Sequence, residues 1–297
     1  MKVLILKLNA TGDVVRTTSL LHRLEGEITW ITAESNVALL RGVRSNVRCL
    51  AWEDRMLAAD TFYDLAISLE DEPETVAFLR EVQHRRVFGA SASPEGVRYG
   101  DDAVEWFDMS LISRHGRVRA DELKLLNRRT YQEMIFAGLG YRFENEPYVL
   151  PSPATSSLYG DVAIAPVAGP IWPMKNWAHY DELRRQLEAT GLCVNVLPKR
   201  ATLTEHLGDI ANHRCLVSGD SLPMHLALGL GVRCVTLFNC TSPWEIHDYG
   251  VQTKLISPLL AEFFYKRGMD TRAVTAIGVE EVLSATLKQL AAPSAAT

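Results

Sequence analysis

Short apolar segments alternate with helical stretches along the whole chain, and this alternation constrains the fold more than any other feature. The apolar segments have the length and β-branched content of buried strands. Strands that alternate with helices indicate parallel sheets wrapped by helices. In the first half we predict strands at residues 3–8, 28–32, 47–51, 65–69 and 86–89, a loop over residues 9–13, and helices over residues 14–24 and 121–137.

A proline-rich and serine-rich stretch at residues 147–157 separates this series from a second one. The second series predicts strands at 162–166, 193–197, 214–218 and 234–238, and helices at 180–189, 203–211, 223–230 and 279–290. A length of 297 residues is near the limit for a single core. We therefore expect an α/β protein with two doubly wound, Rossmann-like domains, 1–152 and 153–297, that face a central cleft, with ligands at the carboxyl ends of the strands.

The composition excludes several functional classes. A net charge of −5 and a pI near 5.9 disfavour a nucleic-acid binder that relies on phosphate neutralisation. The five cysteines show no CxxC spacing, so we expect no metal site. The N-terminal apolar run is too short for a signal sequence, and no run of about 18 apolar residues is present, so we expect a cytoplasmic protein.

The segment 217–227 runs from an apolar strand into an apolar helix, and such a turn can hold a phosphate. Ser221 can donate a hydroxyl and a backbone amide, whereas Asp220 would repel phosphate and is better suited to sugar hydroxyls. His225 is in the first helical turn and can donate to phosphate. The alternatives are helix capping for the Gly-Asp-Ser sequence and a buried core role for the histidine.

Asp13 follows the first strand and Gly12, where a carboxylate can take a proton from a hydroxyl acceptor. The alternative is that Asp13 only caps the following helix. Thr11 is similarly placed, as a structural residue or a weak substrate contact.

Two further loops follow strands of the second half. Lys175 lies in the segment 169–177 and can neutralise a diphosphate, although surface lysines are common. Thr241 lies in the segment 238–243 and can donate to phosphate, although a simple turn explains this segment equally well.

Four motifs in this order resemble the bacterial heptosyltransferases of glycosyltransferase family 9: Gly12-Asp13, Lys175-x-Trp177, Asp220 to His225, and Phe238 to Pro243. The resemblance implies a GT-B fold, with the acceptor bound mainly by the first domain and a nucleotide sugar, commonly ADP-heptose, by the second. It implies inversion without a metal or other cofactor. Asp13 becomes the general base and Lys175 the diphosphate contact. Asp220 would hold sugar hydroxyls, the amides of Ser221 and Leu222 with His225 would line the phosphates, and Glu205 is the candidate for the ribose.

The sequence departs from the family pattern at four positions. Leu222 replaces a usual glycine, Asn239 and Cys240 replace a usual Gly-Pro pair, and Ala178 stands where a proline often follows the Lys-x-Trp motif. The departures leave two alternatives open, another GT-B nucleotide-sugar enzyme such as an epimerase or an enzyme with a different donor, and a non-catalytic nucleotide-sugar-binding protein. An NAD-dependent oxidoreductase is disfavoured because no G-x-G-x-x-G follows the first strand.

The acceptor is expected to be a glycan, a lipid-linked molecule or a small molecule with a hydroxyl. A lipid-linked acceptor would bring peripheral contact with the inner face of the cytoplasmic membrane. A group of basic residues fits either an anionic acceptor or, in the favoured interpretation, a solvated helix face: Arg114, Arg117, Arg119, Lys124, Arg128 and Arg129.

Overall fold

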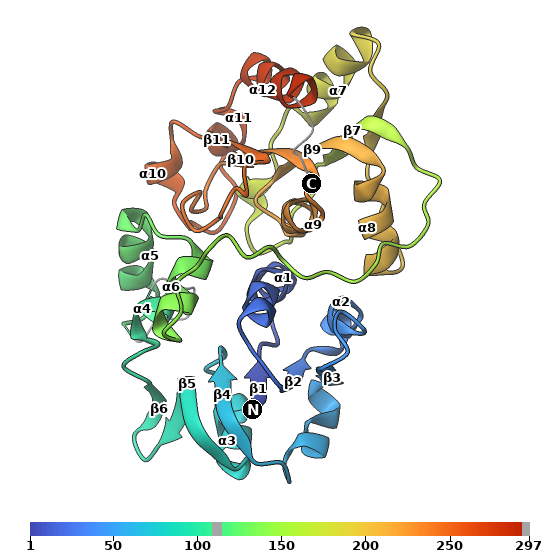
Figure 1. The fold of residues 1–297 in the computed structure, drawn as a ribbon. Coiled ribbons are helices and arrows are strands. Elements are labelled where there is room, and N and C mark those ends of the chain that lie inside the picture. The colour runs from blue at the N-terminus through green and yellow to red at the C-terminus, as the bar shows by residue number, and fades with distance from the viewer. Residues whose placement is uncertain (109–114, 293–297) are drawn as a thin grey trace. The chain divides into compact units, whose positions relative to one another are not determined.

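The computed structural model describes residues 1–108 and 115–292, and it divides into two compact units, Met1–Pro151 and Ser152–Thr297. Arg114 lies outside the described residues. Each unit contains one sheet flanked by helices (Figure 1).

The first unit has a six-stranded sheet in the order β3-β2-β1-β4-β5-β6, and only the β5–β6 pairing is antiparallel. Its strands are β1 (Lys2–Leu6), β2 (Glu27–Thr32), β3 (Val47–Ala51), β4 (Tyr63–Ser68), β5 (His84–Ser93) and β6 (Gly96–Tyr99). Its α-helices are α1 (Thr11–Thr17), α2 (Val37–Leu40), α3 (Pro73–Glu81), α4 (Val104–Asp108), α5 (Arg117–Leu126) and α6 (Tyr131–Gly138). Three 3-10 helices are η1 (Thr18–His22), η2 (Glu34–Asn36) and η3 (Trp52–Ala58).

The second unit has a five-stranded, fully parallel sheet in the order β11-β10-β9-β7-β8. Its strands are β7 (Gly160–Ala165), β8 (Val194–Val196), β9 (His213–Gly219), β10 (Arg233–Phe238) and β11 (Gln252–Ile256). Its helices are η4 (Pro173–Lys175), α7 (Tyr180–Ala189), α8 (Leu203–Ala211), α9 (Leu222–Leu230), α10 (Leu260–Phe263), α11 (Thr271–Thr275) and α12 (Val279–Ala291).

Helices cover both faces of the second sheet. Helices α7 and α12 pack against each other on one face, and α8 and α9 pack against each other on the opposite face (Figure 1). Apolar side chains of β7, β9 and β10 are fully buried against α7 and α12. This double covering explains why these strands are continuously apolar in sequence.

The strand order reverses once in each unit. In the first, the chain moves from β1 outward to β2 and β3 and then returns to add β4 on the other side of β1. In the second, it moves from β7 to β8 and then adds β9 on the other side of β7. Loops diverge at such a switch point, so a crevice opens outside the carboxyl ends of the two strands.

The predicted α/β class and most of the elements are confirmed, with three corrections. The helix predicted over residues 121–137 is two helices, α5 and α6, because Thr130 and Glu133 form a capping box that starts α6. The first helix begins at Thr11, inside the predicted loop. Strands β6 and β11 were not predicted, because both lie at sheet edges and are only partly buried.

Candidate active site

Lys175 and Asp220 lie at the switch point of the second sheet, after strands β7 and β9. Lys175 ends η4, in the connection after β7, and Asp220 directly follows β9. A Cβ atom at Gly219 would lie 2.6 Å from the Lys175 carbonyl oxygen, so glycine is needed for the two loops to approach. This approach places the Lys175 Nζ 3.1 Å from an Asp220 carboxylate oxygen, with the two side chains 16% and 13% exposed. The predicted diphosphate contact and the predicted sugar contact therefore form an ion pair.

The charge of Asp220 is fixed by its neighbours. Burial raises the pKa of this carboxyl, but the positive charges of Lys175 and His225, a hydrogen bond from Lys175 and the neighbouring Thr241 hydroxyl lower it to about 2. Four residues from three predicted motifs thus act on one another. Asp220 is consequently ionised at neutral pH, which suits an acceptor of sugar hydroxyl protons.

Helix α9 begins beside this pair. Ser221 is its N-cap residue, yet the Ser221 side chain makes no capping hydrogen bond, and its hydroxyl donates to the Gly219 carbonyl at 3.3 Å. The side-chain capping alternative is therefore wrong. The amides of Met224 and His225 bond to the Ser221 carbonyl. Because Pro223 has no amide hydrogen, the first-turn donors left for an anion are those of Ser221 and Leu222.

The residues that depart from the family pattern after β10 have structural roles. The Asn239 amide donates to the Met174 carbonyl at 3.0 Å, which ties this loop to η4 beside Lys175. Cys240 is buried in a small apolar cluster with Met174 and Phe263. Burial raises the pKa of the Cys240 thiol to about 12, so this cysteine is a packing residue.

A partly buried lysine that was not predicted holds the same loop. Lys254 on β11 donates its ammonium to the carbonyl oxygens of Pro243, at 2.8 Å, and Ile246. Burial lowers the pKa of Lys254. The only signal in the sequence is a lysine within a short edge strand, which does not reveal its partners.

The structure gives Glu205 a local role. Its carboxylate accepts from the backbone amide and the hydroxyl of Thr202, both at 2.9 Å, in a capping box that starts α8. These hydrogen bonds lower the pKa of Glu205. Ribose binding by Glu205 stays a prediction, and it would compete with this cap.

In the first unit, Asp13 lies in the first turn of α1, together with Thr11 and Gly12. The N-cap residue is Ala10, so the prediction that Asp13 is the cap is wrong. One Asp13 carboxylate oxygen accepts from two nitrogens of Arg16, at 2.8 and 3.1 Å, and the Asp13 side chain is 30% exposed.

Arg16 is itself fixed by the protein interior. Its guanidinium lies 4.1 Å from the centroid of the Tyr131 ring, and the Tyr131 hydroxyl is 2.7 Å from the Thr17 hydroxyl. Burial and the charge of Asp13 raise the pKa of Tyr131. Helix α6 thus supports the arginine that orients the candidate base.

The loop between β1 and α1 is held by residues that sequence reasoning missed. Glu70, after β4, forms an ion pair with Lys7 at 2.8 Å, with side-chain exposures of 1% and 4%. The same Glu70 oxygen accepts from the amides of Leu8, at 2.7 Å, and Asn9, at 2.8 Å. This loop leads directly into the first turn of α1.

Asn36 holds the other side of this loop. Its amide donates to the Leu8 carbonyl at 2.6 Å, and its side-chain oxygen accepts from the Thr11 hydroxyl at 2.8 Å. Thr11 thus has the structural role that was one of its two interpretations. The site prediction for Thr11 as a substrate contact stays untested.

Four basic residues of the group considered for an anionic acceptor have local partners. Arg117 and Arg119 pair with acids one turn away, Arg129 pairs with Glu105, and Arg128 donates to backbone carbonyls. Lys124 is buried, so a solvated face is wrong for this residue.

Among residues 1–108 and 115–292, no helix is long and apolar enough to cross a bilayer. The same residues contain no cluster of three or more His, Cys, Asp or Glu side chains suited to a metal ion.

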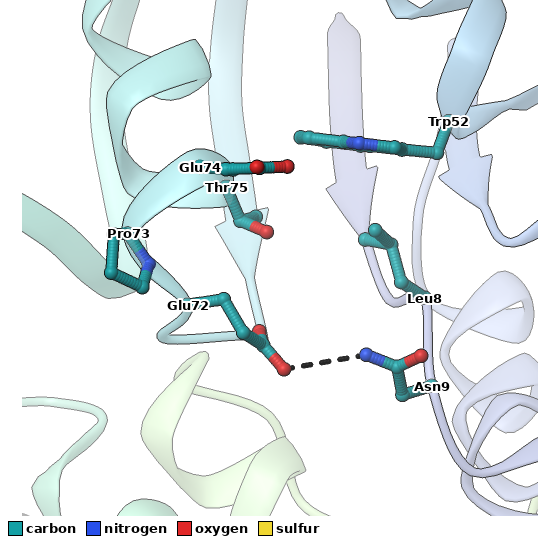
Figure 2. A pocket seen from close by; sticks show the side chains of 7 residues that line it. All are labelled: Leu8, Asn9, Trp52, Glu72, Pro73, Glu74 and Thr75. Carbon is teal, nitrogen blue, oxygen red and sulfur yellow. Dashed lines mark hydrogen bonds between the residues drawn. The ribbon is translucent and has the colours of Figure 1, made fainter.

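A cavity lies at the switch point of the first sheet (Figure 2). It has a volume of about 460 Å³ and is lined by Leu8, Asn9, Trp52, Glu72, Pro73, Glu74 and Thr75. Neither the tryptophan nor the glutamates were singled out from the sequence, because they come from two separate segments, one after β3 and one after β4.

Comparison with known proteins relates part of the second unit to a family. Residues 162–263 match the model of glycosyltransferase family 9 (heptosyltransferase), and this segment contains Lys175, Asp220, His225 and Thr241. The predicted resemblance to this family is confirmed over this segment, which holds three of the four motifs. No curated protein matches the chain significantly.

Solved structures match nearly the whole chain. The heptosyltransferase WaaC of E. coli, solved with ADP, is 17% identical with a TM-score of 0.64, and the match covers 97% of this chain and 100% of that one. A family 9 glycosyl transferase of Veillonella parvula is 15% identical with a TM-score of 0.64, over 97% of each chain. The ADP-heptose lps heptosyltransferase II of E. coli is 16% identical with a TM-score of 0.61, over 98% of each chain. The predicted GT-B fold class is confirmed.

Proposed function

We propose that this chain, part of which matches the family 9 model, transfers a sugar from a nucleotide-diphosphate donor to a hydroxyl acceptor, with inversion and without a metal. The observation that carries the proposal is the Lys175–Asp220 ion pair at the start of α9. A cation, a helix N-terminus and a carboxylate that can accept from sugar hydroxyls lie together there, and this supports a site for a diphosphate-linked sugar.

The donor in this proposal is ADP-heptose. E. coli WaaC, to which the chain is similar in fold, has been solved with ADP and with ADP-2-deoxy-2-fluoro heptose. In this chain the Lys175 ammonium would move part of its interaction from Asp220 to the diphosphate. The amides of Ser221 and Leu222, with His225 and Thr241, would receive the phosphate oxygens, while Asp220 holds sugar hydroxyls.

The reaction in this proposal is a direct displacement. Asp13 takes the proton from the acceptor hydroxyl, the hydroxyl oxygen bonds to the anomeric carbon, and the bond from that carbon to the diphosphate breaks. Arg16 holds the Asp13 carboxylate in place, since it bonds one of its oxygens through two nitrogens. Negative charge on the departing ADP is stabilised by Lys175 and by the α9 N-terminus. The localisation of the enzyme, in the cytoplasm or at the inner face of the cytoplasmic membrane, depends on the acceptor.

The test is a transfer assay with ADP-heptose and a panel of glycan, lipid-linked and small-molecule acceptors. ADP release and the mass of the product are measured for the wild-type protein and for Asp13→Asn. The proposal predicts a product heavier by one heptose unit in the wild type only. Donor binding with no transfer to any acceptor would instead favour a non-catalytic nucleotide-sugar-binding protein. Conversion of ADP-heptose into an epimeric sugar nucleotide of the same mass, with no ADP released, would favour an epimerase.

A further inference from the structure

The cavity of the first unit has the position expected of a substrate site. Leu8 and Asn9 follow β1, and Glu72 to Thr75 follow β4, so the cavity lies where the strand order reverses. Open α/β sheets bind ligands at this place. Its volume of about 460 Å³ is sufficient for a sugar unit.

One wall of the cavity is a fixed aromatic ring. The Trp52 indole packs edge to face on Phe78, with ring centroids 5.7 Å apart, and the Arg55 guanidinium stacks 4.3 Å from the indole centroid. These contacts hold the ring in one orientation, and Leu8 and Pro73 extend the apolar lining. A flat apolar surface of this kind suits the C–H face of a sugar ring.

The polar lining consists mainly of hydrogen-bond acceptors. In Figure 2 the Glu74 carboxylate points toward the Trp52 ring, and the Glu72 carboxylate points toward Asn9. The Asn9 amide donates to Glu72 at 3.3 Å. An ionised carboxylate accepts hydrogen bonds and donates none, so a ligand here must bring hydroxyl or ammonium donors.

We propose that this cavity binds the acceptor as a sugar unit that carries hydroxyl or amine groups and no negative charge. The proposal rests on the proposed transferase function. Glu72 and Glu74 are exposed to solvent, and two carboxylates at one cavity disfavour a phosphate or a second carboxylate on the bound sugar. The apolar ring face lies on Trp52, and the donors of the sugar bond to Glu72 and Glu74.

The cavity is connected to the candidate base by a rigid stretch of chain. Asn9 lines the cavity, and Asp13 follows four residues later in the first turn of α1. Glu70 holds the amides of Leu8 and Asn9, and Asn36 holds the Leu8 carbonyl. A sugar bound against Asn9 therefore contacts the loop that positions Asp13.

The test compares three probes of one size without any donor present: methyl glucoside, its 2-amino analogue methyl glucosaminide, and glucose 6-phosphate. Their dissociation constants are measured by ligand-observed NMR with the full chain. We expect the neutral and amine-bearing probes to bind and the phosphate to bind at least about tenfold more weakly. A phosphate that binds as tightly as the other two, or failure of all three to bind, would overturn the proposal.

Variants assign the binding to the cavity. The double variant Glu72→Gln/Glu74→Gln should reduce the preference for the amine over the phosphate about tenfold. Glu81→Gln, an exposed glutamate in the last turn of α3 and outside the lining, is the matched control and should leave it unchanged. Since these measurements need no transfer, they stand if transfer is absent. Transfer that proceeds with unchanged acceptor KM in the double variant overturns this proposal alone.

Discussion

The switch points of the two sheets contain the same kind of ion pair with different exposure. In the first unit, Lys7 and Glu70 are 2.8 Å apart with exposures of 4% and 1%, and Glu70 also bonds to two backbone amides. In the second unit, Lys175 and Asp220 are 3.1 Å apart with exposures of 16% and 13%. A fully buried pair can only hold the chain, whereas a partly exposed pair can exchange a partner for a ligand.

This difference in exposure indicates different roles for the two ion pairs. In the first unit the ion pair fixes a loop, and in the proposed function it is Asp13, beyond that loop, that contacts the substrate. In the second unit the proposed function makes the ion pair itself contact the substrate. Four substitutions test this division.

The largest expected effect follows Asp13→Asn. The asparagine keeps the size of the side chain but cannot take a proton, so kcat of heptose transfer should fall about a thousandfold. ADP affinity, measured by calorimetry, should be unchanged because Asp13 belongs to the other unit. Asp60→Asn, an exposed aspartate of the first unit, is the control. Full transfer activity in Asp13→Asn would contradict the proposal that Asp13 is the general base.

The next effect is on stability and belongs to Glu70→Gln. Loss of the charge leaves the Lys7 ammonium buried without its counter-ion, so the free energy of unfolding should fall by about 3 kcal/mol. Urea unfolding followed by circular dichroism measures this change. A loss below about 0.5 kcal/mol would mean that the pair does not hold the loop.

The third effect is a pH dependence at Asp220. Its pKa is lowered from 3.8 to about 2, so the folded state gains stability above pH 3.8 and loses that gain as the pH falls toward 2. The contribution is about 2 kcal/mol. Urea unfolding of the wild type and of Asp220→Asn across this range should give curves that converge at the acid end. Curves that stay parallel contradict the assignment.

The smallest effect is expected for Lys254→Met. The substitution removes the ammonium that holds the Pro243 and Ile246 carbonyls, so Thr241 loses its fixed position. Donor KM should rise about fivefold with kcat nearly unchanged, because the effect is on binding. Lys288→Met, at an exposed position of α12, serves as the comparison.

The helices and candidate site residues of the second unit could be predicted from the sequence more completely than those of the first. Helices α7 and α8 have the predicted bounds, and Asp220, Ser221 and His225 lie in one continuous segment whose pattern signals a strand followed by a helix. A local pattern can reveal such a segment. The family motifs then connect it to Lys175 and Thr241.

The parts that were missed depend on contacts between distant residues. Glu70 bonds to residues more than sixty positions earlier, and Lys254 bonds to carbonyls that carry no side-chain signal. The cavity combines Trp52 with Glu72 and Glu74 from different loops. Periodicity and spacing describe neighbours along the chain, so they cannot predict contacts between residues that are distant in the sequence.

The most direct test of the central assignment is a calorimetric titration of ADP into the wild-type chain, Lys175→Met and Lys288→Met. The account predicts one ADP site in the wild type and in Lys288→Met, and at least about tenfold weaker binding in Lys175→Met, because the diphosphate loses its cation. Equal ADP affinity in all three proteins, or no binding to the wild type, would contradict the assignment of the donor diphosphate to Lys175 and Asp220.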